Sequence, residues 1–107
     1  MRNPQKRRWL LQGYDGLEPM FQRKLSSSLS EKEISALLQR LAARDLSIPE
    51  LMGASLRKSM KGYNSALEVR RETRERIILS CGSNPHYVAS QHTEYEFQTD
   101  PDMSGIA

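Results

Sequence analysis

The sequence has few of the residue types that most catalytic and metal sites need. Its 107 residues include one cysteine, Cys81, and two histidines, His86 and His92. A lone cysteine excludes an internal disulfide and is typical of a protein from a reducing compartment. It also leaves no paired Cys-x-x-Cys for a structural zinc site. A catalytic Cys–His pair would have to meet in space, which closeness along the chain does not establish. We therefore expect no enzyme, no metal and no cofactor.

Long apolar runs are absent as well. No stretch approaches the roughly 18 consecutive apolar residues of a membrane helix. The basic N-terminus lacks the apolar run and small-residue cleavage site of a signal peptide. We therefore expect a cytoplasmic protein with no membrane contact. Only 37% of the residues are hydrophobic, which leaves material for one domain with a modest core. A homodimer, which we also expect, would enlarge that core.

The charges that are present are distributed unevenly. All sixteen Lys and Arg residues lie between Arg2 and Arg76, whereas the last fourteen residues carry only acids, Glu94, Glu96, Asp100 and Asp102. A basic body with an acidic end indicates a nucleic acid or an acidic protein surface as partner, although solvated helix faces would look the same. We expect a single helical domain over residues 1–97 and a disordered acidic tail over residues 98–107.

Two segments in the middle of the chain carry the same helix-start pattern. Ser30 with Glu33, and Ser47 with Glu50, form the Ser-x-x-Glu pattern of a capping box. These boxes predict helices over residues 31–44 and 48–61, and the first has the apolar spacing of one buried face, at Ile34, Leu37, Leu38 and Leu41. The second is expected to bury Met52 and Met60 and to end at Gly62. The short turn between them predicts a helix-turn-helix.

Further helices complete the predicted fold. Asn3-Pro4 begins a short helix that ends at Gly13, and residues 17–25 form another. Residues 64–79 are expected to form a long, solvent-facing helix, supported by Arg71–Glu75 and Glu72–Arg76 pairs at i, i+4 spacing. The predicted fold class is mainly α, with four to five helices around the tight helix-turn-helix.

The C-terminal part has a different period. From Tyr87 to Phe97 the side chains alternate with a period of two, which predicts a short strand. A strand is not stable alone. It would pair with residues 77–81 as a hairpin, with its own copy in a dimer, or with the sheet edge of a partner.

The candidate partner-binding residues are large apolar side chains near the N-terminus. They are Trp9, Leu10, Met20 and Phe21. Because the predicted helices that carry them are too short to be stable alone, these side chains must pack either into the domain's own core or onto a partner. This number of large apolar side chains on short helices favours a small non-enzymatic regulatory protein that binds another protein. The expected type is an anti-activator or adaptor in transcriptional regulation, with a transcription regulator as partner.

Two basic clusters are candidates for contacts with nucleic acid or an acidic surface. They are Lys6, Arg7 and Arg8, next to Trp9, and Arg70, Arg71 and Arg74. Cations can neutralise phosphates, and an aromatic side chain can stack on a base. Acids interleave the second cluster, however, which is also the pattern of an ordinary solvated helix.

A short run around the two capping boxes resembles a known family. Leu29-Ser30-x-x-Glu33, Leu38, Leu41-Ala42 and Leu46-Ser47-x-x-Glu50-Leu51 resemble the opening of the helix-turn-helix domain of LuxR-type transcription regulators. In that family the second helix supports a recognition helix in the major groove. The resemblance therefore implies the alternative function, a DNA-binding helix-turn-helix regulator. It covers about a fifth of the chain and ends there, because Ser55, Arg57 and Gly62 stand where the family has core aliphatic residues.

Overall fold

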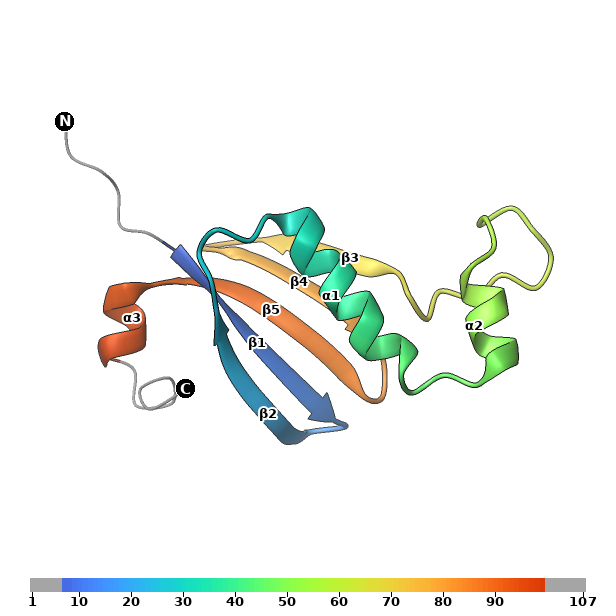
Figure 1. The fold of residues 1–107 in the computed structure, drawn as a ribbon, viewed down its shortest axis with the longest axis horizontal. Helices are drawn as coiled ribbons and strands as arrows, with labels where there is room; N and C mark the ends of the chain where they lie inside the picture. Colours follow the sequence, from blue (N-terminus) through green and yellow to red (C-terminus); the bar gives the residue numbers. More distant parts are fainter. Residues whose placement is uncertain (1–6, 100–107) are drawn as a thin grey trace.

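The computed structural model describes residues 7–99, which form one antiparallel sheet with three short helices (Figure 1). The strands are β1 (Arg7–Asp15), β2 (Glu18–Leu25), β3 (Val69–Thr73), β4 (Ile77–Gly82) and β5 (His86–Thr93). The helices are α1 (Glu31–Ala43), α2 (Ile48–Ala54) and α3 (Glu94–Thr99). The strand order is β2-β1-β5-β4-β3. The predicted mainly α fold is therefore wrong, since a five-stranded sheet organises the molecule.

The N-terminal residues form a β-hairpin instead of the two predicted short helices. Asp15 pairs with Glu18, so the turn consists of Gly16 and Leu17. Gly16 has a φ of +63°, and glycine at the first turn position is typical of a type II′ hairpin. The usual strand pattern, in which apolar and polar residues alternate, is missing here because both faces of β1 are covered. Trp9 and Leu11 are buried on one face and Leu10 on the other, so the three residues read as a continuous apolar run.

The predicted helix over residues 64–79 is also wrong, because this segment forms β3, a turn and β4. The expected local pairs do not form. Arg71 instead binds Glu31 at the start of α1, at 2.7 Å, and Arg76 binds Glu96 in α3, also at 2.7 Å. Arg71 and Arg76 therefore bind acids that are distant in the sequence and not their i, i+4 neighbours. The β-branched Ile77 and Ile78 also favour a strand over a helix.

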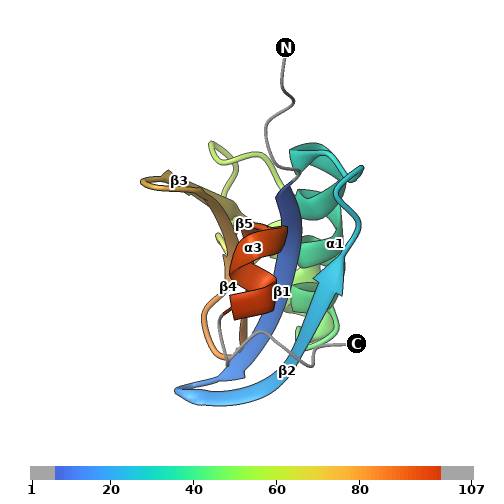
Figure 2. The ribbon, with the colours of Figure 1, turned by 90° about the vertical axis from the view of Figure 1, so that its left-hand side faces the viewer.

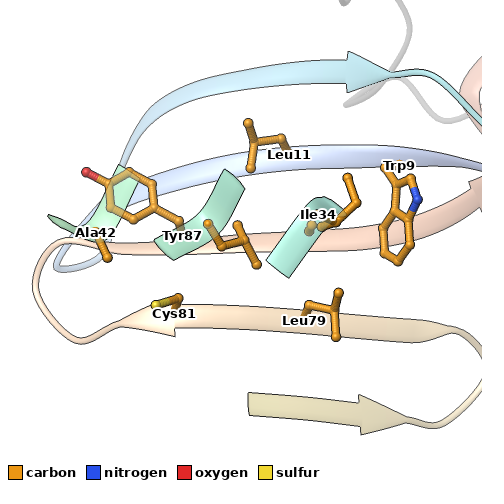
Figure 3. Close-up of a cluster of buried hydrophobic side chains, with 9 residues drawn as sticks. Trp9, Leu11, Ile34, Ala42, Leu79, Cys81 and Tyr87 are labelled. Atoms are coloured by element: carbon orange, nitrogen blue, oxygen red, sulfur yellow. The ribbon is translucent and has the colours of Figure 1, made fainter. Parts of the chain in front are cut away.

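One face of the sheet packs against α1 and forms the core. Trp9 and Leu11 on β1, Leu79 and Cys81 on β4, and Tyr87 and Ala89 on β5 surround Ile34 and Leu38 (Figure 3). The indole Nε1 of Trp9 donates a hydrogen bond to the Leu29 carbonyl, at 2.9 Å. This bond fixes the chain just before α1 begins, so the sheet and the helix cap are tied together.

Both predicted capping boxes are present, but they do not build a helix-turn-helix. Ser30 and Ser47 each accept the backbone N–H three residues on, and Glu33 and Glu50 bind back. However, α2 has only seven residues and ends long before the predicted residue 61. Among the described elements, α1 packs across β3, β4 and β5, whereas α2 has no comparable packing on any strand or helix. The predicted helix-turn-helix is therefore wrong.

The predicted C-terminal strand is present in part. β5 pairs with β4, as in the hairpin alternative, and also with β1, so it lies in the middle of the sheet. It ends at Thr93, and α3 follows at once. The unpaired strand that motivated a homodimer is therefore gone, and homodimerisation stays a prediction. The predicted tail over residues 98–107 begins inside α3 and otherwise lies outside the described residues.

α1 and α3 pack on opposite faces of the sheet (Figure 2). Along each strand, side chains alternate between the two faces. The core face carries Trp9 and Leu11, so Leu10 points to the other face, where Phe97 of α3 covers it. Within residues 7–99, no helix is long and apolar enough to cross a membrane.

Candidate protein-docking surface

The segment between α1 and β3 forms a projecting unit, residues 48–64, which we call the α2 arm. α2 follows the Ser47 cap, has Pro49 in its first turn, and ends at Ala54 with Ser55 as its C-cap. The chain then returns along α2, and Asn64 closes the loop. The Asn64 side chain donates to the Glu50 carbonyl at 3.0 Å, and its backbone N–H donates to the Gly53 carbonyl at 3.4 Å.

Glycine at position 53 is what allows this close return. A Cβ built on Gly53 would lie 2.6 Å from Asn64 Nδ2 and 2.7 Å from the Gly62 carbonyl oxygen. Gly62 itself has a φ of +91°, a conformation that favours glycine. The arm is thus held by its own glycines and by Asn64, with little help from the sheet.

Apolar side chains on the arm are exposed to an unusual degree. Ile48 is 69% exposed, Met52 66% and Met60 41%. They account for half of the large apolar side chains that are exposed within residues 7–99. The arm also carries an open groove of about 580 Å³. Its lining is almost wholly apolar: Ile48, Pro49, Leu51, Met52, Gly53, Ser55, Leu56 and Gly62. A clustered exposed apolar surface of this kind marks an interaction site more often than a free surface.

Positive charge lies on the return loop of the arm, next in the sequence to the groove residues Leu56 and Gly62. Arg57, Lys58 and Lys61 are exposed on the return loop, and the arm has a single acid, Glu50. The pKa of Glu50 is lowered by the backbone N–H of Ser47, which holds its carboxylate in the cap. The Glu68 carboxylate lies 3.6 Å from Lys58 Nζ, and Arg57 and Lys58 line a second cavity that shares Ser55 and Leu56 with the groove. We call Arg57, Lys58 and Lys61 the positive rim of the arm.

The structure places the four predicted partner-binding residues in different environments. Trp9 and Leu10 are buried, on opposite faces of β1, and so complete the molecule's own interior. Phe21 is half-buried, and its ring lies 6.2 Å from that of Tyr87. Met20 is 46% exposed on β2. The four residues do not form one surface.

Three of the six predicted basic contacts lie at one end of the sheet, and Arg70 and Arg71 lie within β3. Arg7, Arg8 and Arg74 lie where β1 begins and β3 ends, whereas Lys6 lies outside the described residues. Arg8 binds Glu94 at 3.2 Å, and Arg71 binds Glu31. Arg70 donates to the Gly82 carbonyl on the neighbouring strand, at 2.9 Å. Acids and carbonyls of the chain itself therefore occupy several of these cations.

The candidate nucleophile and the histidines do not meet. Cys81 is fully buried on the core face, and burial raises the pKa of its thiol. His86 and His92 lie on the opposite face, where His86 stacks on Tyr14 at a ring distance of 5.2 Å. Across the part of the chain that the structure describes, no cluster of three His, Cys, Asp or Glu residues could hold a metal ion.

Sequence reasoning missed the exposed arm. It assigned Met52 and Met60 to a buried helix face, because a helix over residues 48–61 would need such a face. The capping box and Gly53 were visible in the sequence, but the exposure of these methionines depends on how far α2 lies from the sheet. No protein-family model, curated protein or solved structure matches this chain.

Proposed function

We propose that this protein is a non-enzymatic binding module of the anti-activator or adaptor type, which docks onto another protein through the α2 arm. The observation that carries the proposal is the apolar groove of the arm with its exposed Ile48 and Met52. The partner segment is amphipathic, with apolar side chains for the groove and carboxylates for Arg57, Lys58 and Lys61. The expected role in transcriptional regulation, with a transcription regulator as partner, stays a prediction, whereas the DNA-binding alternative depended on the helix-turn-helix and is not proposed.

Several physical arguments support a protein partner over a second copy of the chain. Each large apolar side chain that moves from water into a packed contact contributes about 1.5–3 kcal/mol. Methionine adapts its shape to different partners. Two copies that met arm to arm would bring two positive rims together, which opposes self-association. An acidic, amphipathic segment meets both the apolar and the charged requirement, as in helix-in-groove recognition.

The cellular location is part of the same proposal. A cytoplasmic protein fits a chain whose single cysteine is buried in the core and has no second cysteine to pair with.

Site-specific photocrosslinking tests the docking surface. A photoreactive phenylalanine analogue is placed at Met52 or at Ile48 in the full chain, in its native cells. The matched control position is Leu17, which is 97% exposed but lies in the turn between β1 and β2. We expect one crosslinked protein from both arm positions and none from Leu17. With that protein purified, Met52→Lys and Lys61→Glu should each weaken binding roughly tenfold or more.

Three results would contradict the proposal. They are crosslinks of equal strength from Leu17, no crosslink from either arm position, and a crosslinked product that contains only copies of this chain. An unchanged affinity in the Met52→Lys chain would likewise show that the partner binds elsewhere.

A further inference from the structure

We infer that the sheet carries a second binding site, under α3, for a short acidic segment with an aromatic side chain, and that α3 is its built-in occupant. The site lies on the sheet face opposite α1. Its residues are Arg8 and Leu10 on β1, Lys24 on β2, His92 on β5 and Arg76 just before β4. It lies at the other end of the molecule from the α2 arm (Figure 1), so the inference does not depend on the proposed docking surface.

The contacts of α3 define what the site binds. Phe97 and Leu10 bury each other, and both are only 3% exposed. The Lys24 ammonium lies 5.2 Å from the centre of the Phe97 ring, and the His92 ring meets the same ring edge-on at 5.7 Å. The site therefore has an aromatic pocket with a cation above the ring.

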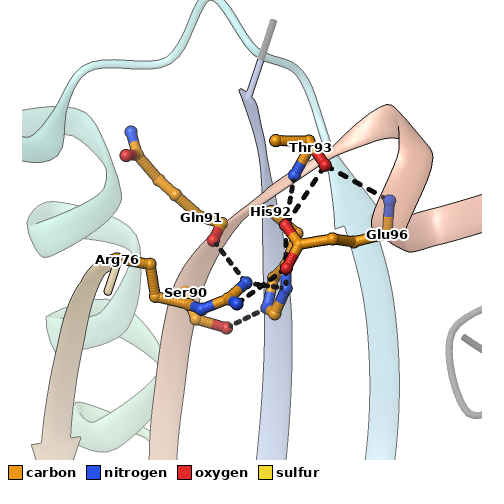
Figure 4. A network of polar contacts seen from close by, with 6 residues as sticks. All are labelled: Arg76, Ser90, Gln91, His92, Thr93 and Glu96. Atoms are coloured by element: carbon orange, nitrogen blue, oxygen red, sulfur yellow. Dashed lines mark hydrogen bonds and ion pairs between the residues drawn. The ribbon is translucent and has the colours of Figure 1, made fainter. Parts of the chain in front are cut away.

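Two carboxylates flank this aromatic side chain. Glu94 binds Arg8 at 3.2 Å. Glu96 binds Arg76 at 2.7 Å, and Figure 4 shows this pair with its neighbours. Cations are thus placed to receive the pattern Glu-x-Glu-Phe. A segment with the same two charges and a ring would satisfy the same contacts.

The cations are held in place by the sheet and not only by α3. Arg76 Nη1 donates to the Gln91 carbonyl at 3.1 Å and also contacts His92 Nδ1. His92 Nε2 is bonded to Ser90 Oγ at 2.8 Å, which fixes the ring. Arg8 Nε donates to the Leu25 carbonyl at 3.4 Å. Binding to a site whose hydrogen-bond donors are already oriented costs less conformational entropy than binding to a site whose side chains must first become ordered.

α3 is held by its packing and its ion pairs, and not by its own helical stability. It has six residues, which is too short for a helix that is stable alone. Of its two ion pairs, Arg8–Glu94 is partly exposed, with side-chain exposures of 33% and 40%, and such a pair contributes little. Arg76–Glu96 is the shorter and less exposed pair, so Arg76 is the cation for which a partner segment must compete. Segments of this kind open at low free energy compared with the core. A partner segment of matching chemistry therefore competes with α3 for the site.

A peptide titration on the full chain tests the inference. The probe is a fluorescent peptide with the sequence of residues 93–99, Thr-Glu-Tyr-Glu-Phe-Gln-Thr. In the full-length Phe97→Ala chain the built-in occupant loses its ring, so we expect this chain to bind the peptide roughly tenfold or more tightly than the unchanged chain. Arg76→Gln in the Phe97→Ala background should abolish that gain.

Matched peptides show whether the chemistry is the one inferred. A peptide with Ala in place of its Phe, and one with Gln in place of both Glu residues, should each lose binding. No binding to a folded Phe97→Ala chain, binding unaffected by Arg76→Gln, or equal binding of an oligothymidylate would overturn the inference.

A second variant covers loss of folding. If the Phe97→Ala chain loses its sheet by circular dichroism, the Glu94→Gln/Glu96→Gln chain is titrated instead, with the same expected gain. Loss of the sheet in both variants would show that α3 belongs to the fold and is not a removable occupant, and would also overturn the inference.

Discussion

The Tyr87 hydroxyl donates a hydrogen bond of 2.7 Å to the Asp45 carboxylate. This bond joins the middle strand of the sheet to the chain just after α1, and so to the base of the α2 arm. Tyr87 is only 3% exposed. Burial, and then the bond to Asp45, raise the pKa of Tyr87 to about 12, against 10 for an ordinary tyrosine. The fold thus favours the neutral phenol.

This raised pKa predicts a loss of stability at alkaline pH. Because the pKa of Tyr87 is higher in the folded than in the unfolded state, its contribution is complete below pH 10 and is lost as the pH rises from 10 to about 12. Its size is on the order of 2 kcal/mol. Urea unfolding between pH 9 and 12 measures it, with Tyr87→Phe as control. An equally steep decline in the Tyr87→Phe chain would assign the effect to other groups.

The lowered pKa of Glu96 predicts a loss of stability at acid pH. This loss concerns α3, at the other end of the sheet from Asp45. The Arg76 guanidinium, and then the Thr93 backbone N–H, lower the pKa of Glu96 to about 2, from 4.5. Its stabilising effect on α3 is therefore complete above pH 4.5 and is lost as the pH falls from 4.5 to about 2. The methyl resonances of Leu10, which packs on Phe97, report the release of α3 in an NMR titration. In the Glu96→Gln chain this step should vanish, and a titration that is the same in both chains would refute the assignment.

The close contact between Gly13 and the Phe21 ring predicts that a larger residue at position 13 destabilises the fold. A Cβ built on Gly13 would lie 2.5 Å from Cε2 of Phe21 on the paired strand. Gly13→Ala should therefore force the ring aside and lower the free energy of unfolding by about 1–3 kcal/mol. Urea denaturation measures the change. Phe21→Leu in the same chain should restore part of the loss, because it removes the clashing ring atoms. A Gly13→Ala chain as stable as the original would show that the ring moves freely.

The two capping boxes were predicted correctly from the sequence, whereas the other predicted helices and the long-range strand pairing were not. Both capping boxes are where Ser30 and Ser47 indicated, because a capping box is made within four consecutive residues. The strands were missed because their signals depend on distant partners. Arg71 and Glu75 have helical spacing along the chain, but the structure gives Arg71 a partner 40 residues away, Glu31. Gly16, at the first position of the two-residue turn, was the local hairpin signal in the N-terminal region.

The candidate site was less predictable than the fold. Leu10 and Met52 are similar apolar residues in helix-like patterns, yet Leu10 is buried under Phe97 and Met52 is exposed. The difference depends on which element covers each face, and the sequence states neither the position of α3 nor the distance of α2 from the sheet. The pairs Arg8–Glu94 and Arg76–Glu96 likewise join α3 to residues that lie 86 and 20 positions away along the chain.

The two capping boxes provide a matched pair of variants, because their local chemistry is the same and their surroundings differ. α1 buries Ile34 and Leu38 against the sheet, whereas α2 projects from it. Ser30→Ala should therefore lower the global free energy of unfolding by about 0.5–2 kcal/mol, the usual effect of a lost N-cap. Ser47→Ala should leave global unfolding almost unchanged, because α2 can open while the sheet stays folded.

Hydrogen exchange separates the two effects. In the Ser47→Ala chain we expect faster amide exchange confined to residues 48–64, and in the Ser30→Ala chain we expect it to increase across α1 and the central strands. If Ser47→Ala lowered the urea midpoint as much as Ser30→Ala, the arm would have to be coupled to the core. The arm would then be part of the cooperatively folded body, and the exposure of Met52 and Met60 would have a structural cause in place of a partner.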